Sequence, residues 1–283
     1  WADLAARRPL RTNDLFWIAS MSKAMTAAAV MMLVDEGKVR TDDPVENYLP
    51  EMKALTVAGE SNAPPHRPQR AVTVRDILSH TSGMPFRSPK EEPTLDGLPL
   101  REAVLSYAAT PLLFEPGTKY QYSNAGINTA GRIVEVVSGM PYETFMQKRL
   151  FDPLGMTDTT FWPTEEQVAR LAKSYKPDAA KSNLVETAIG QLRYPLSDRA
   201  RRFPMPAGGL FSTAADTARF CRMLLCRGEL DGRRVLSEKA VREMGTRQTP
   251  PALRESYGYG LTCGEGHCGH GGAQATQMNV DWN

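Results

Sequence analysis

This chain has no large excess of charge of either sign and no long apolar run. Its 34 lysines and arginines nearly balance its 32 aspartates and glutamates, and the net charge of +2 gives no reason to expect nucleic acid or a membrane surface as a partner. The longest apolar run, at about residues 24–34, is shorter than the roughly 20 residues that span a bilayer. A small basic cluster at Arg199, Arg201 and Arg202 is expected to lie in a solvated loop. We therefore expect a globular protein without a membrane span.

Cysteine is also scarce, with four residues in 283. Cys221 and Cys226 share the C-x₄-C spacing of Cys263 and Cys268, and two histidines lie beside the second pair, so the spacing permits a metal site. A Cys263–Cys268 disulfide across a hairpin is the stronger alternative if the compartment is oxidising. Free thiols remain the default expectation, and we expect no metal.

Residues 264–269 spell G-x-G-x-x-G but lack the context of a cofactor site. A dinucleotide site needs a helix that begins at these glycines and an acidic residue about 20 positions later. Strand-like residues follow here instead. We therefore expect no cofactor.

The two ends of the chain carry no visible targeting signal. The chain opens at Trp1 rather than at a methionine, and no signal peptide is visible. Its 283 residues, 41% hydrophobic and 23% charged, are enough to bury a large core and are expected to form two lobes.

The most informative segment that is present is Ser20-Met21-Ser22-Lys23, an S-x-x-K tetrad at the head of a very apolar helix. Residues three apart on a helix lie on one face, so Lys23 can reach the Ser20 hydroxyl. A serine becomes a nucleophile when a base lies within hydrogen-bond reach, and a lysine among apolar side chains has a reason to lose its proton. The tetrad therefore predicts a nucleophile with its own base.

The flanks of the tetrad favour a functional role over a surface helix start. Residues 15–19 are typical of a buried strand, and residues 24–34 are apolar all round, which is typical of a buried helix. Gly37 is expected to end that helix. A serine and a lysine that open a buried helix need polar partners, and a catalytic cleft is the simplest way to supply them.

Two more motifs follow the tetrad: Y-x-N at residues 122–124 and H-x-G at residues 270–272. With its motifs in this order, the chain resembles the serine β-lactamase and penicillin-recognising superfamily. It is most similar to the branch that holds class C β-lactamases, D-alanyl-D-alanine peptidases, family VIII carboxylesterases and D-aminopeptidases. Residues 77–84, 150–156 and 206–213 resemble segments of the same branch, so the resemblance covers almost the whole chain.

The resemblance implies an α+β fold of the β-lactamase/transpeptidase type, with an antiparallel sheet flanked by helices and an inserted, mainly helical lobe. We expect residues 1–60 and 207–283 to form the α/β sheet lobe, which carries the nucleophile helix and the third motif. Residues 61–206 would form the helical lobe, which carries the Y-x-N motif. Against the family the chain looks truncated at both ends, because a helix and strands would precede Trp1, and a strand and a helix would follow Asn283. A periplasmic or secreted location is suggested by the resemblance alone.

The residue pattern also predicts individual elements. Helices are expected at residues 71–79, 100–109, 124–137, 141–151, 214–227 and 237–245. A hairpin-like pair of strands is expected at residues 257–262 and 274–280, on either side of a glycine-rich turn.

Two motifs of class A β-lactamases are missing. There is no K-T-G, and the nearest approach to S-D-N is Ser197-Asp198-Arg199. His270 stands where related cephalosporinases carry a lysine that helps to hold the substrate carboxylate. Because a histidine is mostly neutral at pH 7, it binds an anion less well. These differences argue against a class A enzyme and weaken the case for a dedicated cephalosporinase.

The resemblance implies a serine hydrolase that acts through an acyl-enzyme on Ser20. The expected substrates are small carboxylic esters, with weak β-lactam hydrolysis as a side activity. A true β-lactamase, a D-amino-acid peptidase and an acyltransferase stay open as alternatives with the same nucleophile. A non-catalytic, penicillin-binding-like module is a further alternative. The partner in every case is a small-molecule ester, amide or β-lactam, and no nucleic acid is expected.

The resemblance also implies roles for the residues around Ser20. Lys23 and Tyr122 would share the proton transfers, and either could be the base that activates Ser20. As a base, Tyr122 would need a Lys23 ammonium to lower its pKa from about 10. Asn124 is expected to hydrogen-bond Lys23 or the substrate, and it could also cap the following helix.

The third motif is expected to form one wall of the cleft. His270, Gly271 and Gly272 would lie on a strand whose glycines let the substrate approach the backbone closely. The amides of Ser20 and Ala273 would form the oxyanion hole. His80 is expected to brace the turn at residues 81–83 rather than to act in catalysis.

Overall fold

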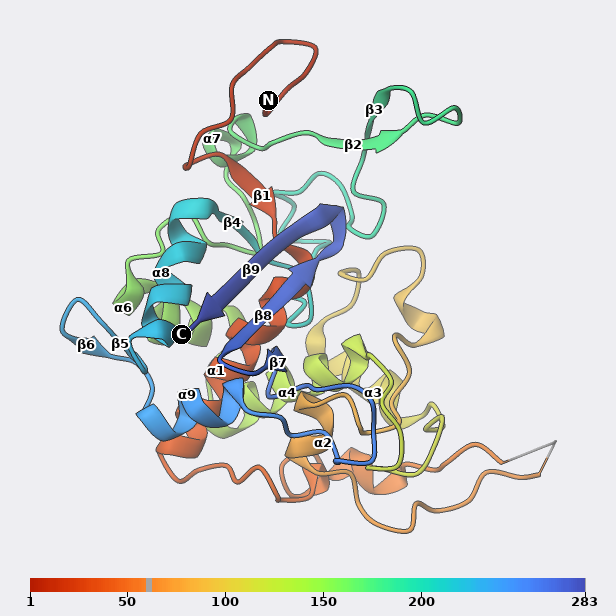
Figure 1. Cartoon of the computed structure of the whole chain (residues 1–283). Coiled ribbons are helices and arrows are strands. Elements are labelled where there is room, and N and C mark those ends of the chain that lie inside the picture. The colour runs from red at the N-terminus through yellow and green to blue at the C-terminus, as the bar shows by residue number, and fades with distance from the viewer. Residues whose placement is uncertain (60–62, 283) are drawn as a thin grey trace.

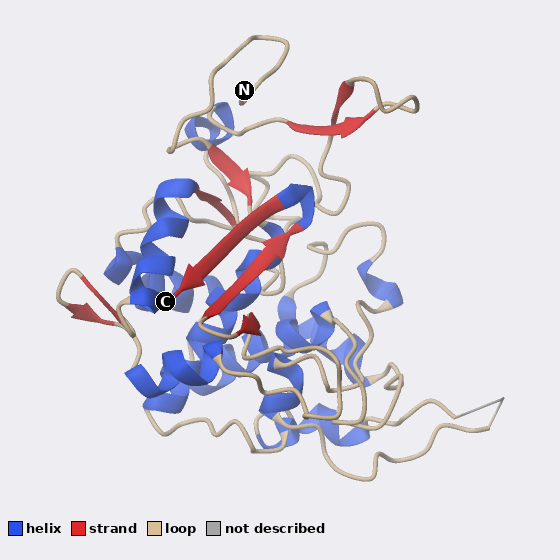
Figure 2. Ribbon diagram, in the orientation of Figure 1, coloured by secondary structure: helices blue, strands red, loops and turns tan. Residues whose placement is uncertain are grey.

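The computed structural model describes residues 1–59 and 63–282, which combine helices with several small antiparallel sheets (Figures 1 and 2). The α-helices are α1 (Ser22–Asp35), α2 (Val74–Leu78), α3 (Leu100–Ala108), α4 (Asn124–Ser138), α5 (Tyr142–Met146), α6 (Asp152–Leu154), α7 (Glu165–Ala169), α8 (Ala214–Leu225) and α9 (Glu238–Gly245). The strands are β1 (Leu15–Trp17), β2 (Ser174–Pro177), β3 (Leu184–Thr187), β4 (Phe211–Thr213), β5 (Glu229–Leu230), β6 (Arg233–Arg234), β7 (Thr262–Gly264), β8 (His267–Gly272) and β9 (Thr276–Asp281). Within the described residues, no helix combines the length and the apolar character needed to cross a membrane.

Helix α1 lies in the core, as its apolar sequence predicts. Every residue from Ser22 to Leu33 is buried, and the helix packs against α4 and α9. Gly37 has a left-handed φ of +68°, and its amide bonds the Val34 carbonyl, so the predicted glycine stop is confirmed. The α-helix begins only at Ser22, because residues Ala19–Met21 form a separate 3₁₀ turn, η1. Ser20 therefore lies in a tight turn between β1 and α1.

The predicted helices are found, but some of them begin or end at other residues than predicted. The prediction for residues 71–79 was too long, since Thr73 is the N-cap of α2 and forms a capping box with Asp76. Residues 141–151 do not form one helix: α5 is followed by a π-helical turn, η6 (Gln147–Phe151). The helices predicted at 100–109, 124–137, 214–227 and 237–245 are α3, α4, α8 and α9.

The hairpin prediction at the C-terminal end was wrong in two respects. The strand predicted at residues 257–262 includes only the first residue of β7 (Thr262–Gly264), whereas the strand predicted at 274–280 is β9 with shifted ends. The glycine-rich segment is not a turn but contains β8, which pairs antiparallel with β7 on one side and β9 on the other. Glycines allow a middle strand to fit closely between two neighbours: a Cβ at Gly269 would lie 2.3 Å from Asn279 Oδ1. Figure 1 shows β8 and β9 lying across the start of α1, and β8 contacts η1, which carries Ser20.

The prediction of a solvated basic loop was wrong for one of its three arginines. Arg199 and Arg201 are exposed, but Arg202 is only 2% exposed and pairs with Asp96, which is 1% exposed. Arg202 Nε donates to Asp96 Oδ2 at 2.7 Å, and the guanidinium also donates to the carbonyls of Phe161 and Leu196. These contacts tie residues 196–202 to the interior.

We expect Arg202→Met to lower the free energy of unfolding by about 3–5 kcal/mol, because it leaves the Asp96 carboxylate buried without its partner. Urea unfolding measures the loss. The matched control is Arg201→Met, whose side chain is 60% exposed and pairs with Asp198, so that its cost should stay below about 1 kcal/mol. Equal losses in the two variants would contradict a buried ion pair that matters for stability.

Candidate active site

Ser20 and Lys23 meet as the tetrad predicts. Lys23 Nζ lies 3.1 Å from Ser20 Oγ. Ser20 is half-buried in the turn that precedes α1, whereas Lys23, in the first turn of α1, is fully buried. The serine is therefore open to a ligand, and the amine reaches it from the interior.

The Lys23 amine is surrounded by neutral oxygens. Besides Ser20 Oγ, it contacts Asn124 Oδ1 and the Ala207 carbonyl oxygen, each at 2.7 Å. No carboxylate in the described part of the chain forms an ion pair with it. Burial therefore lowers the pKa of Lys23 well below its ordinary value of 10.5. A neutral amine can donate its two hydrogens to Asn124 and Ala207 and present its lone pair to the Ser20 hydroxyl.

Tyr122 lies beside this pair but keeps its proton. Lys23 Nζ is 4.6 Å from the centroid of the Tyr122 ring. Burial raises the pKa of Tyr122, and its hydrogen bond with Ser20 only partly opposes that shift. A Lys23 ammonium that would lower the pKa of Tyr122 is not favoured either, because burial lowers the pKa of Lys23. At neutral pH the phenol is therefore a proton donor rather than an acceptor.

Asn124 reaches Lys23 because another residue caps its helix. Ser123 is the N-cap of α4, and its hydroxyl accepts from the Gly126 amide at 3.0 Å. Asn124 is the first residue of α4 and is 4% exposed. Its side-chain oxygen is thus free of capping and bonds the amine.

His80 braces the segment that carries Tyr122, not the turn at residues 81–83. Its ring is fully buried, and the centroid of the ring lies 4.5 Å from that of the Tyr122 ring. The His80 Nδ1 accepts from the Ser123 amide at 3.2 Å. The Gln121 amide also donates to the His80 carbonyl at 2.9 Å. The sequence motif around His80 therefore fixes the backbone on both sides of Tyr122.

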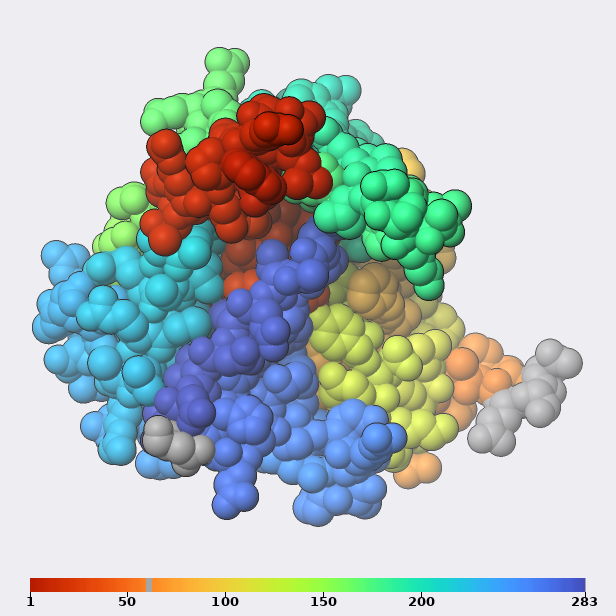
Figure 3. Space-filling view, turned by 45° about the horizontal axis from the view of Figure 1, so that its top comes forward, coloured from red at the N-terminus to blue at the C-terminus, as the bar shows by residue number. Residues whose placement is uncertain are grey.

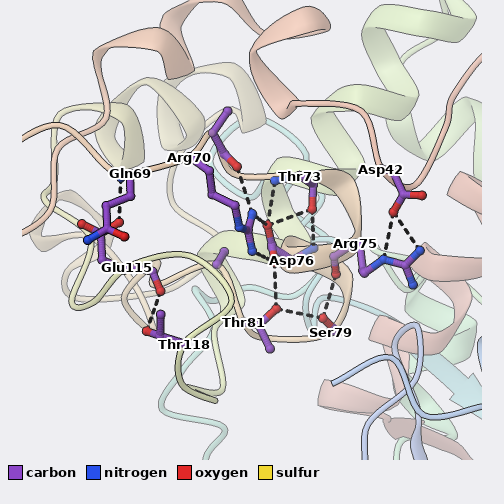
Figure 4. Close-up of polar contacts among 12 residues, drawn as sticks. Asp42, Gln69, Arg70, Thr73, Arg75, Asp76, Ser79, Thr81, Glu115 and Thr118 are labelled. Atoms are coloured by element: carbon purple, nitrogen blue, oxygen red, sulfur yellow. Dashed lines mark hydrogen bonds and ion pairs between the residues drawn. The ribbon is translucent and has the colours of Figure 1, made fainter. Parts of the chain in front are cut away.

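Buried Asp76 in turn holds the segment of His80. Figure 4 shows Arg70, Thr73 and Thr81 converging on the Asp76 carboxylate, which Arg70 contacts with both terminal nitrogens, at 2.6 and 2.9 Å. Thr81 Oγ1 donates to the same carboxylate at 3.1 Å, one residue after His80. This set of bonds allows His80 to adopt its left-handed φ of +62°.

The third motif lies on β8 at the other side of Tyr122. His270 is 6% exposed, and the centroid of its ring lies 6.0 Å from that of the Tyr122 ring. Its Nδ1 lies 2.5 Å from the Gly271 carbonyl oxygen. Burial, with a contribution from Lys23, lowers the pKa of His270 to about 4, so this histidine is neutral at pH 7. In Figure 3 the C-terminal strands cross the face of the molecule between the α8–α9 region and the middle of the chain.

The end of β8 lies against the backbone that precedes Ser20. A Cβ at Gly272 would lie 2.4 Å from the Ile18 carbonyl oxygen, so a glycine is required there. Ala273 begins the short turn η7 (Ala273–Ala275), which contacts η1. The two turns that carry the amides of Ser20 and Ala273 are thus in contact, and neither amide donates to a backbone carbonyl within residues 1–59 and 63–282. Gly271 is exposed beside them.

Sequence reasoning missed three residues that hold Lys23 in place: Ala207, Asn128 and Tyr107. Asn128 Oδ1 accepts from the Ala207 amide at 3.0 Å, and Asn128 Nδ2 donates to the Tyr107 hydroxyl at 2.9 Å. Tyr107 in turn donates to Glu91 at 2.6 Å. All three side chains are at most 2% exposed. The one available signal was the spacing of Asn128, four residues after Asn124 and so on the same helix face.

The candidate metal ligands do not come together. In the part of the chain that the structure describes, no group of three or more histidines, cysteines and carboxylates is placed to hold a metal ion. Cys221, Cys226, Cys263 and Cys268 are all free thiols.

Comparison with known proteins identifies the family. The Beta-lactamase family model matches residues 1–281. Protein Rv1367c of Mycobacterium tuberculosis is 35% identical over 268 residues, which cover 91% of this chain and 65% of that protein. Lovastatin esterase of Penicillium rubens is 31% identical over 236 residues, which cover 77% of this chain and 57% of the esterase. The chain thus spans less than two thirds of the length of these relatives.

A solved structure is similar over the whole chain. EstCE1, described as a hydrolase with promiscuous acyltransferase activity, superposes with a TM-score of 0.80 at 23% identity, covering 100% of this chain and 80% of EstCE1. This likeness confirms the expected β-lactamase/transpeptidase-like α+β fold. With a family match from the first residue almost to the last, the chain belongs to the Beta-lactamase family.

Proposed function

We propose that this protein is a serine hydrolase that forms an acyl-enzyme on Ser20 and acts on small carboxylic esters. The observation that carries the proposal is the fully buried Lys23 amine. Its hydrogen-bond partners in the described chain are all oxygen atoms, and one of them is Ser20 Oγ. Burial lowers the pKa of such a lysine, so it gives up its own proton more readily than a solvated lysine and can then accept the proton of Ser20. A structural lysine would instead pair with a carboxylate or reach solvent.

The proposed reaction uses each group in its favoured protonation state. Ser20 Oγ attacks the ester carbonyl while its proton passes to the Lys23 amine. The resulting ammonium has three hydrogens and three oxygen neighbours, Ser20, Asn124 and Ala207. The protonated Tyr122 donates its proton to the departing alkoxide, and the Lys23 ammonium then returns a proton to Tyr122, so that the amine is free again. The amides of Ser20 and Ala273 stabilise the oxyanion, and a water then hydrolyses the acyl-enzyme.

Two observations favour esters over β-lactams. Lovastatin esterase, a relative named for ester cleavage, is similar over most of this chain. His270 is neutral, so the third motif supplies no charge for a substrate carboxylate. A β-lactamase, a D-amino-acid peptidase and an acyltransferase would share Ser20 and differ in substrate or acceptor, whereas a non-catalytic module would not need a neutral lysine.

Labelling and turnover together test the proposal. The protein is incubated with a fluorophosphonate and, separately, with a penicillin, and the intact mass is measured. We expect a fluorophosphonate adduct on Ser20 and faster hydrolysis of a short-chain nitrophenyl ester than of a chromogenic cephalosporin. Faster cephalosporin turnover would favour a β-lactamase. No adduct with either reagent on folded protein would rule out the nucleophile.

We expect Asn128→Leu to lower kcat/KM for the ester by on the order of 10-fold to 10²-fold, because the Ala207 carbonyl that orients Lys23 loses its support. The hydrogen bond to the Ala207 carbonyl is stronger from an ammonium than from a neutral amine, so weakening it should also move the acid limb of the pH–rate profile to lower pH. Thr129→Val is the control, since Thr129 is buried on the same helix but bonds only the Ala125 carbonyl and the Met84 sulfur. An unmoved acid limb in Asn128→Leu would show that Asn128 acts only on stability.

A further inference from the structure

Cys263 and Cys268 lie directly opposite each other in the β7–β8 hairpin. The Cys263 amide donates to the Ser256 carbonyl at 3.1 Å, and therefore points away from β8. This makes Cys263 and Cys268 a non-hydrogen-bonded pair, in which opposed Cα atoms are about 4.5 Å apart. Disulfides join Cα atoms that are about 4.4–6.8 Å apart, so the backbone is already suitable.

Both sulfur atoms also lie near the C-terminal end of α9. Cys263 Sγ lies 3.8 Å from the Met244 carbonyl oxygen, and a Cβ at Gly245 would lie 3.9 Å from Cys268 Sγ. The two thiols thus face the C-terminal turn of α9, on one side of the sheet, as opposed residues of a strand pair do. Gly258 leaves room for Cys263, because a Cβ there would lie 2.8 Å from its sulfur.

One of the two thiols is accessible to a small anionic reagent. Cys268 is fully buried, but Cys263 is partly exposed and lines a cavity of about 500 Å³. Three arginines and one carboxylate line the same cavity: Arg227, Arg242, Arg247 and Glu238. The excess of positive charge favours an anionic disulfide such as oxidised glutathione.

We propose that Cys263 and Cys268 form a cross-strand disulfide by exchange with an anionic low-molecular-weight disulfide. The Cys263 sulfur attacks one glutathione sulfur, which releases one reduced glutathione and leaves a mixed disulfide. The Cys268 sulfur then attacks Cys263 and releases the second reduced glutathione, so the two thiol hydrogens end on the two leaving thiols. The bond links β7 to β8 two residues before His270, and so braces the strand that carries the third motif.

The exchange should be slow at neutral pH and faster in alkali. Burial raises the pKa of Cys263 to about 11 and that of Cys268 to about 12, and the thiolate is the attacking species. The experiment is therefore done at pH 9, with excess oxidised glutathione and folded protein. Unreacted thiols are then alkylated under denaturing conditions, the protein is digested with trypsin, and the masses of the peptides are measured.

We expect residues 255–283, which no lysine or arginine interrupts, to appear as one unalkylated peptide that is two hydrogens lighter than its reduced form. Neither Cys221 nor Cys226 should take part in the bridge, and the exposed Cys226 should carry one glutathione. Cys268→Ser should keep one glutathione on Cys263, whereas Cys226→Ser, a change at an exposed cysteine, should leave the bridge intact. The thermal midpoint should rise by a few degrees on oxidation and fall again with dithiothreitol.

Three results would overturn the proposal. The first is full alkylation of Cys263 and Cys268 after equilibration with excess oxidised glutathione. The second is a bridge from either of them to Cys221. The third is a glutathione adduct on Cys263 of the wild type that does not resolve to a disulfide. Because mass is the readout, none of these results depends on whether the protein hydrolyses esters.

Discussion

Replacing Ser20 by alanine is expected to lower kcat for a nitrophenyl ester by at least about 10⁴-fold and to abolish the fluorophosphonate adduct. The alanine has no oxygen to carry the acyl group, and the remaining groups can only orient a water molecule. Steady-state hydrolysis and intact mass measure the two effects. The fold should not suffer, because Ser20 is only half-buried and lies ahead of α1.

Ser22→Ala is the matched control for this change. Ser22 belongs to the same tetrad and is fully buried, but its hydroxyl donates to the Ala19 carbonyl at 2.6 Å and has no contact with Lys23 in the described structure. We expect Ser22→Ala to lower stability while the fluorophosphonate adduct persists. If Ser22→Ala lost the adduct and Ser20→Ala kept it, the nucleophile would be Ser22 and the proposal would be contradicted.

Replacing Lys23 by methionine is expected to lower kcat by about 10²–10⁴-fold, because Ser20 loses the base that takes its proton. Lys23→Arg should be equally inactive, since a guanidinium stays protonated at any working pH. For the wild type, kcat/KM should rise with pH through the lowered pKa of Lys23 and then reach a plateau at a pH below 10.5. Activity in Lys23→Met equal to that of the wild type would contradict a lysine base.

The same substitution should stabilise the fold at neutral pH. The pKa of Lys23 lies well below its ordinary value of 10.5 in the folded chain, so between these two values the unfolded chain holds a proton that the folded chain lacks. The free energy of unfolding therefore rises with pH in that window. Lys23→Met removes this dependence together with the cost of deprotonating the amine. Urea unfolding at several pH values should show a flatter profile and a higher midpoint at pH 7.

The contacts that the sequence predicted correctly are mostly local or depend on motifs. Ser20 and Lys23 are three residues apart, so the geometry of one helical turn is enough to bring them together. Tyr122 and Asn124 could be placed beside them only through the order of the three motifs. The division into two lobes stays a prediction.

What could not be predicted depends on long-range packing. The Ala207 carbonyl is a backbone atom 184 positions from Lys23, and no residue type marks it. The burial of Arg202 depends on Asp96, which is 106 positions away. The glycines of β8 were interpreted as a turn because a glycine favours turns locally, and only the two neighbouring strands make it a middle strand. For Lys23 the choice between amine and ammonium required its three oxygen neighbours and the absence of a carboxylate.

The complete enclosure of Lys23 has a practical consequence for chemical coupling. Of the ten lysines, Lys23 is 0% exposed and the other nine are all exposed. Reagents that modify primary amines, such as activated esters of dyes or of solid supports, will therefore react at the nine surface lysines while the chain stays folded. A reagent in water can reach those nine amines, whereas the Lys23 amine is completely buried. The protein can be attached to a bead through its surface lysines while the fold protects Lys23, the proposed base.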